Sequence, residues 1–282
     1  MSLRVGIDIG STTVKVVVLD EHNKLLFRSY ERHYSKTRER TCQTLQGLRG
    51  MLGGQEIKLS ITGSAGLGVA KAADLDFVQE VYATAAAVRQ FIPQTDAVIE
   101  LGGEDAKIIF FGNTLEERMN GSCAGGTGAF IDQMAVLLDV TPSELDHLAQ
   151  GAERIYTIAS RCGVFAKSDV QPLINQGAKA EDISASIYQA VVNQTIAGLA
   201  QGRPIKGNVL YLGGPLTFSR VLRESFDHTL GVQGTCPENS LLYVALGAAF
   251  YSDQEFDLNQ VADDLQKHGA AETYRSLPPL FS

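Results

Sequence analysis

Cysteine is scarce in this 282-residue chain, which has only Cys42, Cys123, Cys162 and Cys236. Four scattered cysteines are too few for the disulfide framework of a small secreted domain. The N-terminus also lacks the basic region followed by an apolar stretch that marks a signal peptide. We therefore expect a cytoplasmic protein.

Positive charge and long apolar runs are limited too. Lysine and arginine number 24 against 32 acidic residues, which gives a net charge of −8. This balance disfavours a nucleic-acid backbone or an anionic membrane as the main partner. No apolar run reaches the length of about 20 residues that a membrane-spanning helix needs. We expect neither a nucleic-acid nor a membrane partner, and the length allows two domains.

The N-terminal segment predicts a β-hairpin that could bind phosphate. Residues 3–10 and 14–20 read as buried strands on either side of the turn Gly10–Thr13, and residues 25–33 read as a third strand. Backbone N–H groups and hydroxyls in such a turn can surround phosphate oxygens, with Asp8 pointing at a metal ion or water. A plain hydrophobic hairpin with a polar turn is the alternative.

Residues 97–111 repeat this pattern as strand, Gly-Gly turn with an acid, and strand. Glu100 falls where Asp8 falls in the first hairpin, and two carboxylates suit Mg²⁺. Two related half-domains facing each other across a cleft would explain the repeat. The alternative is that Glu100 pairs with a buried lysine, whereas we expect Lys107 on a solvated strand face.

Two cysteines lie in matching glycine-to-helix contexts. Cys123 lies in the small-residue run 120–130 before an apolar helix at 130–138, and Cys162 lies in 160–169 before a helix at about 164–175. A helix N-terminus presents unpaired N–H groups and partial positive charge, which favour a reactive or metal-binding thiolate. The alternative is a pair of small buried residues beside helix caps.

The other expected elements complete a two-domain chain. In the first part we expect helices at 41–52 and 82–91 and a strand at 58–62. Further on we expect a helix at 180–199, a strand from 208 that stops at a Gly-Gly-Pro turn where an adenosine could rest, and helices from 219, at 241–251 and at 258–267. We predict subdomains at 1–95 and 96–252, and a helix and linker tail at 253–282.

In this order the motifs resemble those of the actin-like ATPase superfamily. That resemblance implies an α/β fold of the ribonuclease H-like type shared by actin, hexokinase and heat-shock chaperones, with two facing subdomains and a nucleotide cleft. The segments 120–128 and 160–169 are similar to the two cysteine motifs of the BadF/BadG/BcrA/BcrD family, and the match covers about residues 3–252. Those proteins activate 2-hydroxyacyl-CoA dehydratases and benzoyl-CoA reductases.

The resemblance also implies cofactors, partners and site residues. It implies a homodimer with one [4Fe-4S] cluster between subunits, held by Cys123 and Cys162, and ATP-driven transfer of low-potential electrons from a carrier such as ferredoxin or flavodoxin to a dehydratase-like enzyme. Asp8 and Glu100 would be the catalytic carboxylates near Mg²⁺. The candidate cofactor-binding residues are Gly10, Ser11, Thr12, Thr13, Lys15, Gly102, Gly103, Glu104, Asp105, Gly125, Gly126, Thr127, Gly213, Gly214 and Pro215.

Three departures from the family pattern concern these motifs. Gly125 stands where the small activators usually have alanine, Glu100 replaces an aspartate, and the second turn reads Gly-Gly-Glu-Asp instead of Gly-Gly-Gln-Asp. The Gly-Gly-Pro turn and the C-terminal residues 277–281 look more like the first activase module of a long fused protein. This leaves the acyl-CoA substrate of the partner enzyme open.

The number of thiolates supports the dimer on physical grounds. A [4Fe-4S] cluster takes four thiolates, whereas one chain offers two in suitable contexts. A two-fold dimer would supply four, and Cys42 and Cys236 should be dispensable.

Two alternative functions remain open. A small-molecule kinase of the same fold would need an aspartate as general base, for which Asp105 or Asp169 could serve. A nucleotide-sensing module would carry cysteines that bind zinc or nothing.

Overall fold

The computed structural model describes residues 3–52, 56–120, 126–159, 163–251, 254–257, 259–261 and 263. The chain divides into two compact units, Met1–Ala83 with Ala248–Ser282 and Thr84–Gly247. The second unit thus spans 84–247, whereas the predicted second subdomain spans 96–252, and the described residues after 247 group with the first unit. Among the described residues, no helix combines the length and apolar character needed to cross a membrane.

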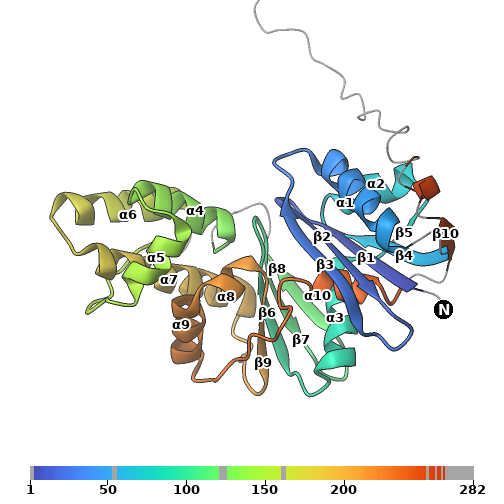
Figure 1. Ribbon diagram of the computed structural model, residues 1–282. Helices are drawn as coiled ribbons and strands as arrows, with labels where there is room; N and C mark the ends of the chain where they lie inside the picture. The colour runs from blue at the N-terminus through green and yellow to red at the C-terminus, as the bar shows by residue number, and fades with distance from the viewer. Residues whose placement is uncertain are drawn as a thin grey trace, which may run out of the picture. The chain divides into compact units, whose positions relative to one another are not determined.

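The first unit is built on a mixed sheet in the order β10-β4-β1-β2-β3, with β5 beside β4 (Figure 1). Its strands are β1 Leu3–Ile9, β2 Thr13–Leu19, β3 Leu25–Arg32, β4 Glu56–Thr62, β5 Asp76–Phe77 and β10 Glu255–Asp257. Its helices are α1 Thr37–Leu52 and α2 Gly66–Ala72. Apolar residues of β1, β2 and β4 form one buried cluster with Leu45, Leu48 and Leu52 of α1. The sheet therefore buries an apolar face under α1, and its first hairpin rests on a packed core.

The second unit combines the sheet β8-β7-β6-β9 with most of the helices. The strands are β6 Ala97–Leu101, β7 Ala106–Phe110, β8 Glu116–Met119 and β9 Val209–Leu212. The helices are α3 Glu80–Phe91 (which begins in the first unit), α4 Gly128–Leu137, α5 Pro142–Ala149, α6 Gly163–Asn175, α7 Ala180–Thr195, α8 Gly214–Phe218, α9 Arg220–Leu230 and α10 Tyr243–Ala248, with a π-helical turn η1 at Ile196–Ala200.

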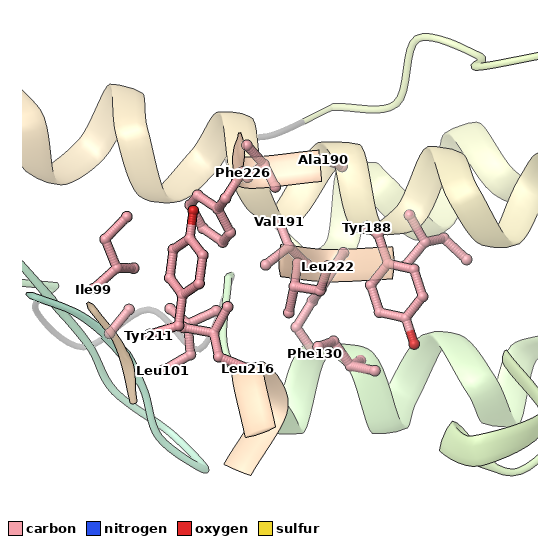
Figure 2. Packing of buried hydrophobic residues seen from close by; sticks show 14 of the residues in the cluster. Ile99, Leu101, Phe130, Tyr188, Ala190, Val191, Tyr211, Leu216, Leu222 and Phe226 are labelled. Carbon is pink, nitrogen blue, oxygen red and sulfur yellow. The ribbon is translucent and has the colours of Figure 1, made fainter. Parts of the chain in front are cut away.

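One apolar cluster joins the sheet and helices of this unit. Figure 2 shows Tyr211 of β9 beside Phe226 of α9, and Phe130 of α4 near Leu222. The rings of Tyr211 and Phe226 have centroids 5.9 Å apart. Because α4, α7 and α9 share this cluster with β6 and β9, the helix that follows the Cys123 segment is fixed to the sheet that carries the second hairpin.

Both predicted hairpins and the order of the main elements are confirmed, with shifted ends. The helices expected from residues 41, 82, 130 and 164 begin at Thr37, Glu80, Gly128 and Gly163. The strand expected from 208 stops at the Gly-Gly-Pro turn as predicted: β9 ends at Leu212, Gly213 has a φ of 86°, and α8 begins at Gly214. The helix expected at 180–199 is α-helical to Thr195 and then changes to η1. The helix expected at 241–251 is shorter, at Tyr243–Ala248, and much of 258–267 lies outside the described residues.

Candidate nucleotide and cysteine-loop site

The first hairpin brings Asp8 and Lys15 together. The two residues are direct partners in the antiparallel register of β1 and β2, and the Lys15 Nζ lies 2.7 Å from the Asp8 Oδ2. The Asp8 side chain is 3 % exposed and that of Lys15 is 17 % exposed. Asp8 is therefore a buried carboxylate balanced by one cation that water can still reach.

The turn between these strands is closed by backbone contacts. The Gly10 N–H donates to the Thr13 carbonyl oxygen at 3.0 Å. His33, which the sequence analysis did not single out, contacts the carbonyls of Gly10 and Thr12. The predicted phosphate residues Gly10 to Thr13 thus form one compact turn next to the Asp8–Lys15 pair.

The second hairpin repeats the acid–lysine pair. Glu100 and Lys107 are register partners in β6 and β7, and the Lys107 Nζ lies 3.6 Å from the Glu100 Oε1 and 2.8 Å from the Asp105 Oδ2. The Thr84 hydroxyl donates to Glu100 at 3.3 Å. The expectation that Lys107 lies on a solvated face was wrong, because both faces of this strand are covered and the lysine side chain is 3 % exposed. The alternative in which Glu100 pairs with a buried lysine is therefore what the structure has, and a magnesium role for Glu100 stays a prediction.

The Gly-Gly-Glu-Asp turn needs glycine at its first position. The Gly102 N–H donates to the Asp105 carbonyl at 2.8 Å, and a Cβ on Gly102 would collide with the Asp105 carboxylate. Asp105 is thus folded over its own turn and held by Lys107. The predicted candidates Gly102, Gly103, Glu104 and Asp105 all belong to this turn, at the end of β6.

Three glycine motifs converge at this turn. The N–H groups of Gly128 and Ala129, at the start of α4, donate to the carbonyls of Gly102 and Gly103 at 2.9 and 2.8 Å. A Cβ on Gly128 would lie 3.4 Å from the Pro215 ring. We expected unpaired N–H groups at this helix start, and for these two residues that was wrong, because the second hairpin supplies their acceptors.

Asn120 fixes the other end of the Cys123 loop to the same hairpin. Its side-chain oxygen accepts from the Ala106 N–H at 2.8 Å, and its own N–H donates to the Ala106 carbonyl at 3.0 Å. Residues 121–125, with the candidate ligands Cys123 and Gly125, lie outside the described residues. The described residues on both sides of this segment are therefore bonded to the second hairpin, Asn120 to Ala106 and Gly128 to Gly102. Asn120 is the first residue of the predicted cysteine motif, but the sequence alone indicated no role for its side chain.

The segment before Cys162 is held by polar side chains of α6 and α7. Buried Asp182 accepts from the N–H groups of Glu153 and Arg154 at 2.8 and 3.0 Å. These backbone hydrogen bonds, that of Glu153 first, keep the pKa of Asp182 below its ordinary value. Asp169 accepts from the Ala159 N–H at 2.8 Å, directly before residues 160–162, which lie outside the described residues.

The helices that follow the two cysteine segments lie close together at their starts. Gly163 follows Cys162 and opens α6, and a Cβ on it would lie 3.4 Å from the Phe130 ring in the first turn of α4. The chain folds so that residues adjoining both cysteine segments are neighbours. Within the described ranges, which include neither Cys123 nor Cys162, no group of three or more His, Cys, Asp or Glu side chains could hold a metal ion.

The Gly-Gly-Pro turn is stabilised by hydroxyl groups. The Thr217 hydroxyl donates to the Gly213 carbonyl at 2.7 Å and lies 2.7 Å from the Ser240 hydroxyl. A Cβ on Gly213 would collide with the Leu101 carbonyl, so only glycine fits beside β6. The predicted adenosine turn is thus bonded to the rest of the second unit.

The two cysteines expected to be dispensable have other environments. Cys42 is buried in α1, and burial raises the pKa of its thiol. The Cys236 sulfur lies 3.4 Å from the Ser240 hydroxyl. A raised pKa disfavours the thiolate that binds metal, in agreement with the exclusion of Cys42.

The predicted site residues divide between the units. Asp8 and the turn Gly10–Thr13 with Lys15 belong to the first unit, and the remaining described candidates belong to the second. Among the latter, Thr127 is fully buried, and Gly126 has a φ of 80° beside Thr195 of α7.

Comparisons show which known proteins the chain resembles. The profile of the BadF/BadG/BcrA/BcrD ATPase family matches residues 5–252. The chain is 31% identical over 255 residues to the 2-hydroxyisocaproyl-CoA dehydratase activator of Clostridioides difficile, covering 89% of this chain and 94% of the relative. It is 30% identical to the (R)-2-hydroxyglutaryl-CoA dehydratase activating ATPase of Acidaminococcus fermentans, covering 88% and 95%.

A solved structure extends the similarity to the fold. The activator of the 2-hydroxyisocaproyl-CoA dehydratase from Clostridium difficile with bound ADPNP superposes with a TM-score of 0.77 at 28% identity, covering 96% of this chain and 100% of the other. The predicted actin-like ATPase fold is thereby confirmed.

Proposed function

Because the chain belongs to the BadF/BadG/BcrA/BcrD ATPase family, we propose that it is an ATP-hydrolysing activator that delivers low-potential electrons to a 2-hydroxyacyl-CoA dehydratase or a benzoyl-CoA reductase-like enzyme. Water would cleave ATP to ADP and phosphate. A reduced carrier such as ferredoxin or flavodoxin would be oxidised, and the dehydratase-like partner would be reduced by the same electrons.

The observation that carries this proposal is the attachment of both ends of the Cys123 loop to the second hairpin turn. Asn120 bonds to Ala106 where the loop leaves, and Gly128 bonds to Gly102 where it returns. A shift of this turn on nucleotide binding or hydrolysis would act on both ends of the loop. A protein that only bound nucleotide would not require that connection.

Cys123 and Cys162 would hold one [4Fe-4S] cluster together with the same pair from a second copy, since the cluster takes four thiolates. The described residues near the two cysteines fit this assignment. Gly163, which directly follows Cys162, packs on Phe130 in the helix that follows the Cys123 segment, so the two cysteine segments adjoin neighbouring residues. When bound, such a cluster supplies a centre that accepts and donates single electrons.

Mg-ATP would lie against the glycine turns. We assign the phosphates to the turn Gly10–Thr13 with Lys15 and to Gly102 and Gly103, and the adenosine to the turn Gly213–Pro215. Asp8 would hold Mg²⁺ through water, and Glu100 would contribute beside Lys107. Gly125, Gly126 and Thr127 would bring the cysteine loop close to the phosphates.

The test is a purification without oxygen, followed by iron and acid-labile sulfide analysis and an assay of ATP-dependent reduction of a 2-hydroxyacyl-CoA dehydratase. We expect the protein to contain iron and sulfide, and to release phosphate from ATP without any phosphate acceptor. Phosphate transfer only to an added acceptor would identify a kinase. Nucleotide binding without iron or hydrolysis would identify a sensing module.

The kinase alternative gains no support from its two candidate bases. Asp105 is 2.8 Å from the buried Lys107 ammonium, and Asp169 accepts from the Ala159 backbone. Both carboxylates already have partners that hold them in place, which gives neither a distinguishing feature of a general base.

A further inference from the structure

The turn of the first hairpin is held by a histidine outside every recognised motif. His33 directly follows β3 and is 5 % exposed. Its Nε2 lies 3.0 Å from the Gly10 carbonyl oxygen, and its main-chain N–H donates to the Thr12 carbonyl at 3.2 Å. One residue therefore contacts two carbonyls of the same turn.

The hydrogen bonds of the ring define its protonation. The Ser35 N–H donates to the Nδ1 of His33 at 3.1 Å, and the Thr37 hydroxyl lies 3.5 Å from the same atom. Nδ1 is therefore an acceptor without a proton, and Nε2 carries the hydrogen that is donated to Gly10. Only a neutral imidazole in this tautomer makes both contacts at once.

The backbone after His33 adopts an unfavourable conformation that makes these contacts possible. Tyr34 and Ser35 have φ values of 48° and 63°, a left-handed region that costs free energy for residues other than glycine. The Lys36 N–H donates to the His33 carbonyl at 2.7 Å and closes the bend. Such conformations persist where the surroundings enforce them, often at functional sites.

We propose that His33 is a positioning residue for ATP, which orients the peptide groups of the first hairpin turn. In a planar trans peptide the N–H points away from the C=O. By engaging the Gly10 carbonyl, the His33 ring directs the N–H of the next residue, Ser11, to the opposite side of the turn. The Thr12 carbonyl is held by the main-chain N–H of His33, which does not depend on the side chain. This inference rests on the proposed assignment of the turn to the phosphates.

Three substitutions of His33 separate orientation of the turn from simple packing. His33→Ala removes both ring contacts. The amide of His33→Gln can reach the Nε2 position and donate to Gly10, whereas that of His33→Asn reaches only the Nδ1 position and can accept from Ser35. We expect His33→Ala and His33→Asn to weaken ATP binding about tenfold, the usual effect of one lost hydrogen bond, and His33→Gln to stay within about threefold.

The measurements are ATP affinity by calorimetry, hydrolysis kinetics, and the thermal unfolding midpoint of each variant. The control is His22→Ala, which removes an exposed histidine from the β2–β3 turn, away from Gly10, and should leave all three quantities unchanged. Equal affinity in His33→Asn and His33→Gln would overturn the proposal, as would affinity losses that only follow the loss of stability. If His33→Ala does not fold, the Asn and Gln pair still decides.

A spectroscopic measurement tests the hydrogen bonds of the His33 ring without nucleotide. Nitrogen-15 NMR of the His33 ring in the whole protein should show a neutral imidazole protonated at Nε2. A ring protonated at Nδ1 or at both nitrogens would contradict the hydrogen bond from Nε2 to Gly10. Wild-type protein that binds no ATP would reject the proposed function, whereas normal ATP binding by all three variants would reject only the role of His33.

Discussion

The two hairpins of this protein share one plan and differ in what is attached to them. In each, an acid faces a lysine across the antiparallel pair, Asp8 with Lys15 and Glu100 with Lys107. In each, a parallel strand ends at a glycine with positive φ, Gly63 or Gly213, where a Cβ would collide with the residue after the acid. The repeat therefore extends beyond the hairpins to β4 and β9.

The differences lie in the turns. The first turn is held by a histidine side chain, and its acid has one lysine partner that is partly exposed. The second turn folds Asp105 over itself, shares a buried lysine between two carboxylates, and accepts hydrogen bonds from the start of α4. The comparison shows one scaffold with two different turns, the first held by a histidine side chain and the second bonded to residues that flank the cysteine loop.

The largest expected effect separates the two lysines. Lys107→Met leaves Glu100 and Asp105 without their buried cation and should lower the free energy of unfolding by about 3–5 kcal/mol. Lys15→Met should cost less, about 1–2 kcal/mol, because the lysine that it removes is partly exposed and only one carboxylate loses a partner. Urea unfolding measures both, with the exposed Lys24→Met as control. Equal losses for the two lysines would remove the contrast between the hairpins.

The next effect separates the two acids. Asp8→Ala should lower ATP turnover about 10²–10³-fold, as loss of a group that stabilises transition-state charge does, and lower ATP affinity much less. Glu100→Gln should change turnover by less than about tenfold, since its main partner is Lys107. Hydrolysis rates and calorimetric affinities decide the matter. Normal turnover in Asp8→Ala would remove Asp8 from the site, and equal losses would mean that both acids serve the metal.

A third pair of substitutions tests what the hairpins share. Gly63→Ala and Gly213→Ala each force a side chain into a positive-φ position against backbone of the neighbouring strand. Each should cost about 2–3 kcal/mol of stability, from backbone strain together with overpacking. Thermal unfolding is the measurement, and Gly177→Ala, which has positive φ but nothing within 4 Å, isolates the strain alone. If only one of the two variants is destabilised, the two glycines occupy similar positions but do not contribute equally to stability.

The smallest expected effect concerns the loop attachment. Asn120→Ala removes the side-chain bond to Ala106 and should cost about 1 kcal/mol, but it should also speed the loss of iron from anaerobic protein. Asn208→Ala is the matched control, because it removes a similar bond to the Gln94 carbonyl in the same unit. Iron loss at the same rate in both variants would show that the Asn120 contact does not hold the loop.

Much of this fold could be predicted from the sequence because its strands are short apolar runs that end at glycine turns. The hairpins at 3–20 and 97–111 carry that pattern, and the two cysteine motifs stood out by their glycine content. Helix α5 was missed although Thr141-Pro-Ser-Glu144 is a readable helix start, whose capping box the structure contains.

The remaining contacts depend on tertiary structure. Lys107 looked exposed because charged residues usually are, and only the layers on both faces of its strand bury it. The contact of His33 with Gly10 needs β3 to lie beside β2 and a left-handed bend at Tyr34 and Ser35 that their residue types do not favour. No local pattern encodes such contacts, so their roles could not be predicted.

The most direct test of the whole account is the iron content and mass in solution of four single variants prepared without oxygen. Cys123→Ala and Cys162→Ala leave each subunit one thiolate and should lose iron and electron transfer while they keep ATP binding. Cys42→Ala and Cys236→Ala should retain both. Full iron in either variant of the first pair, or iron loss confined to the second pair, would contradict the assignment of the cysteines and with it the proposed function.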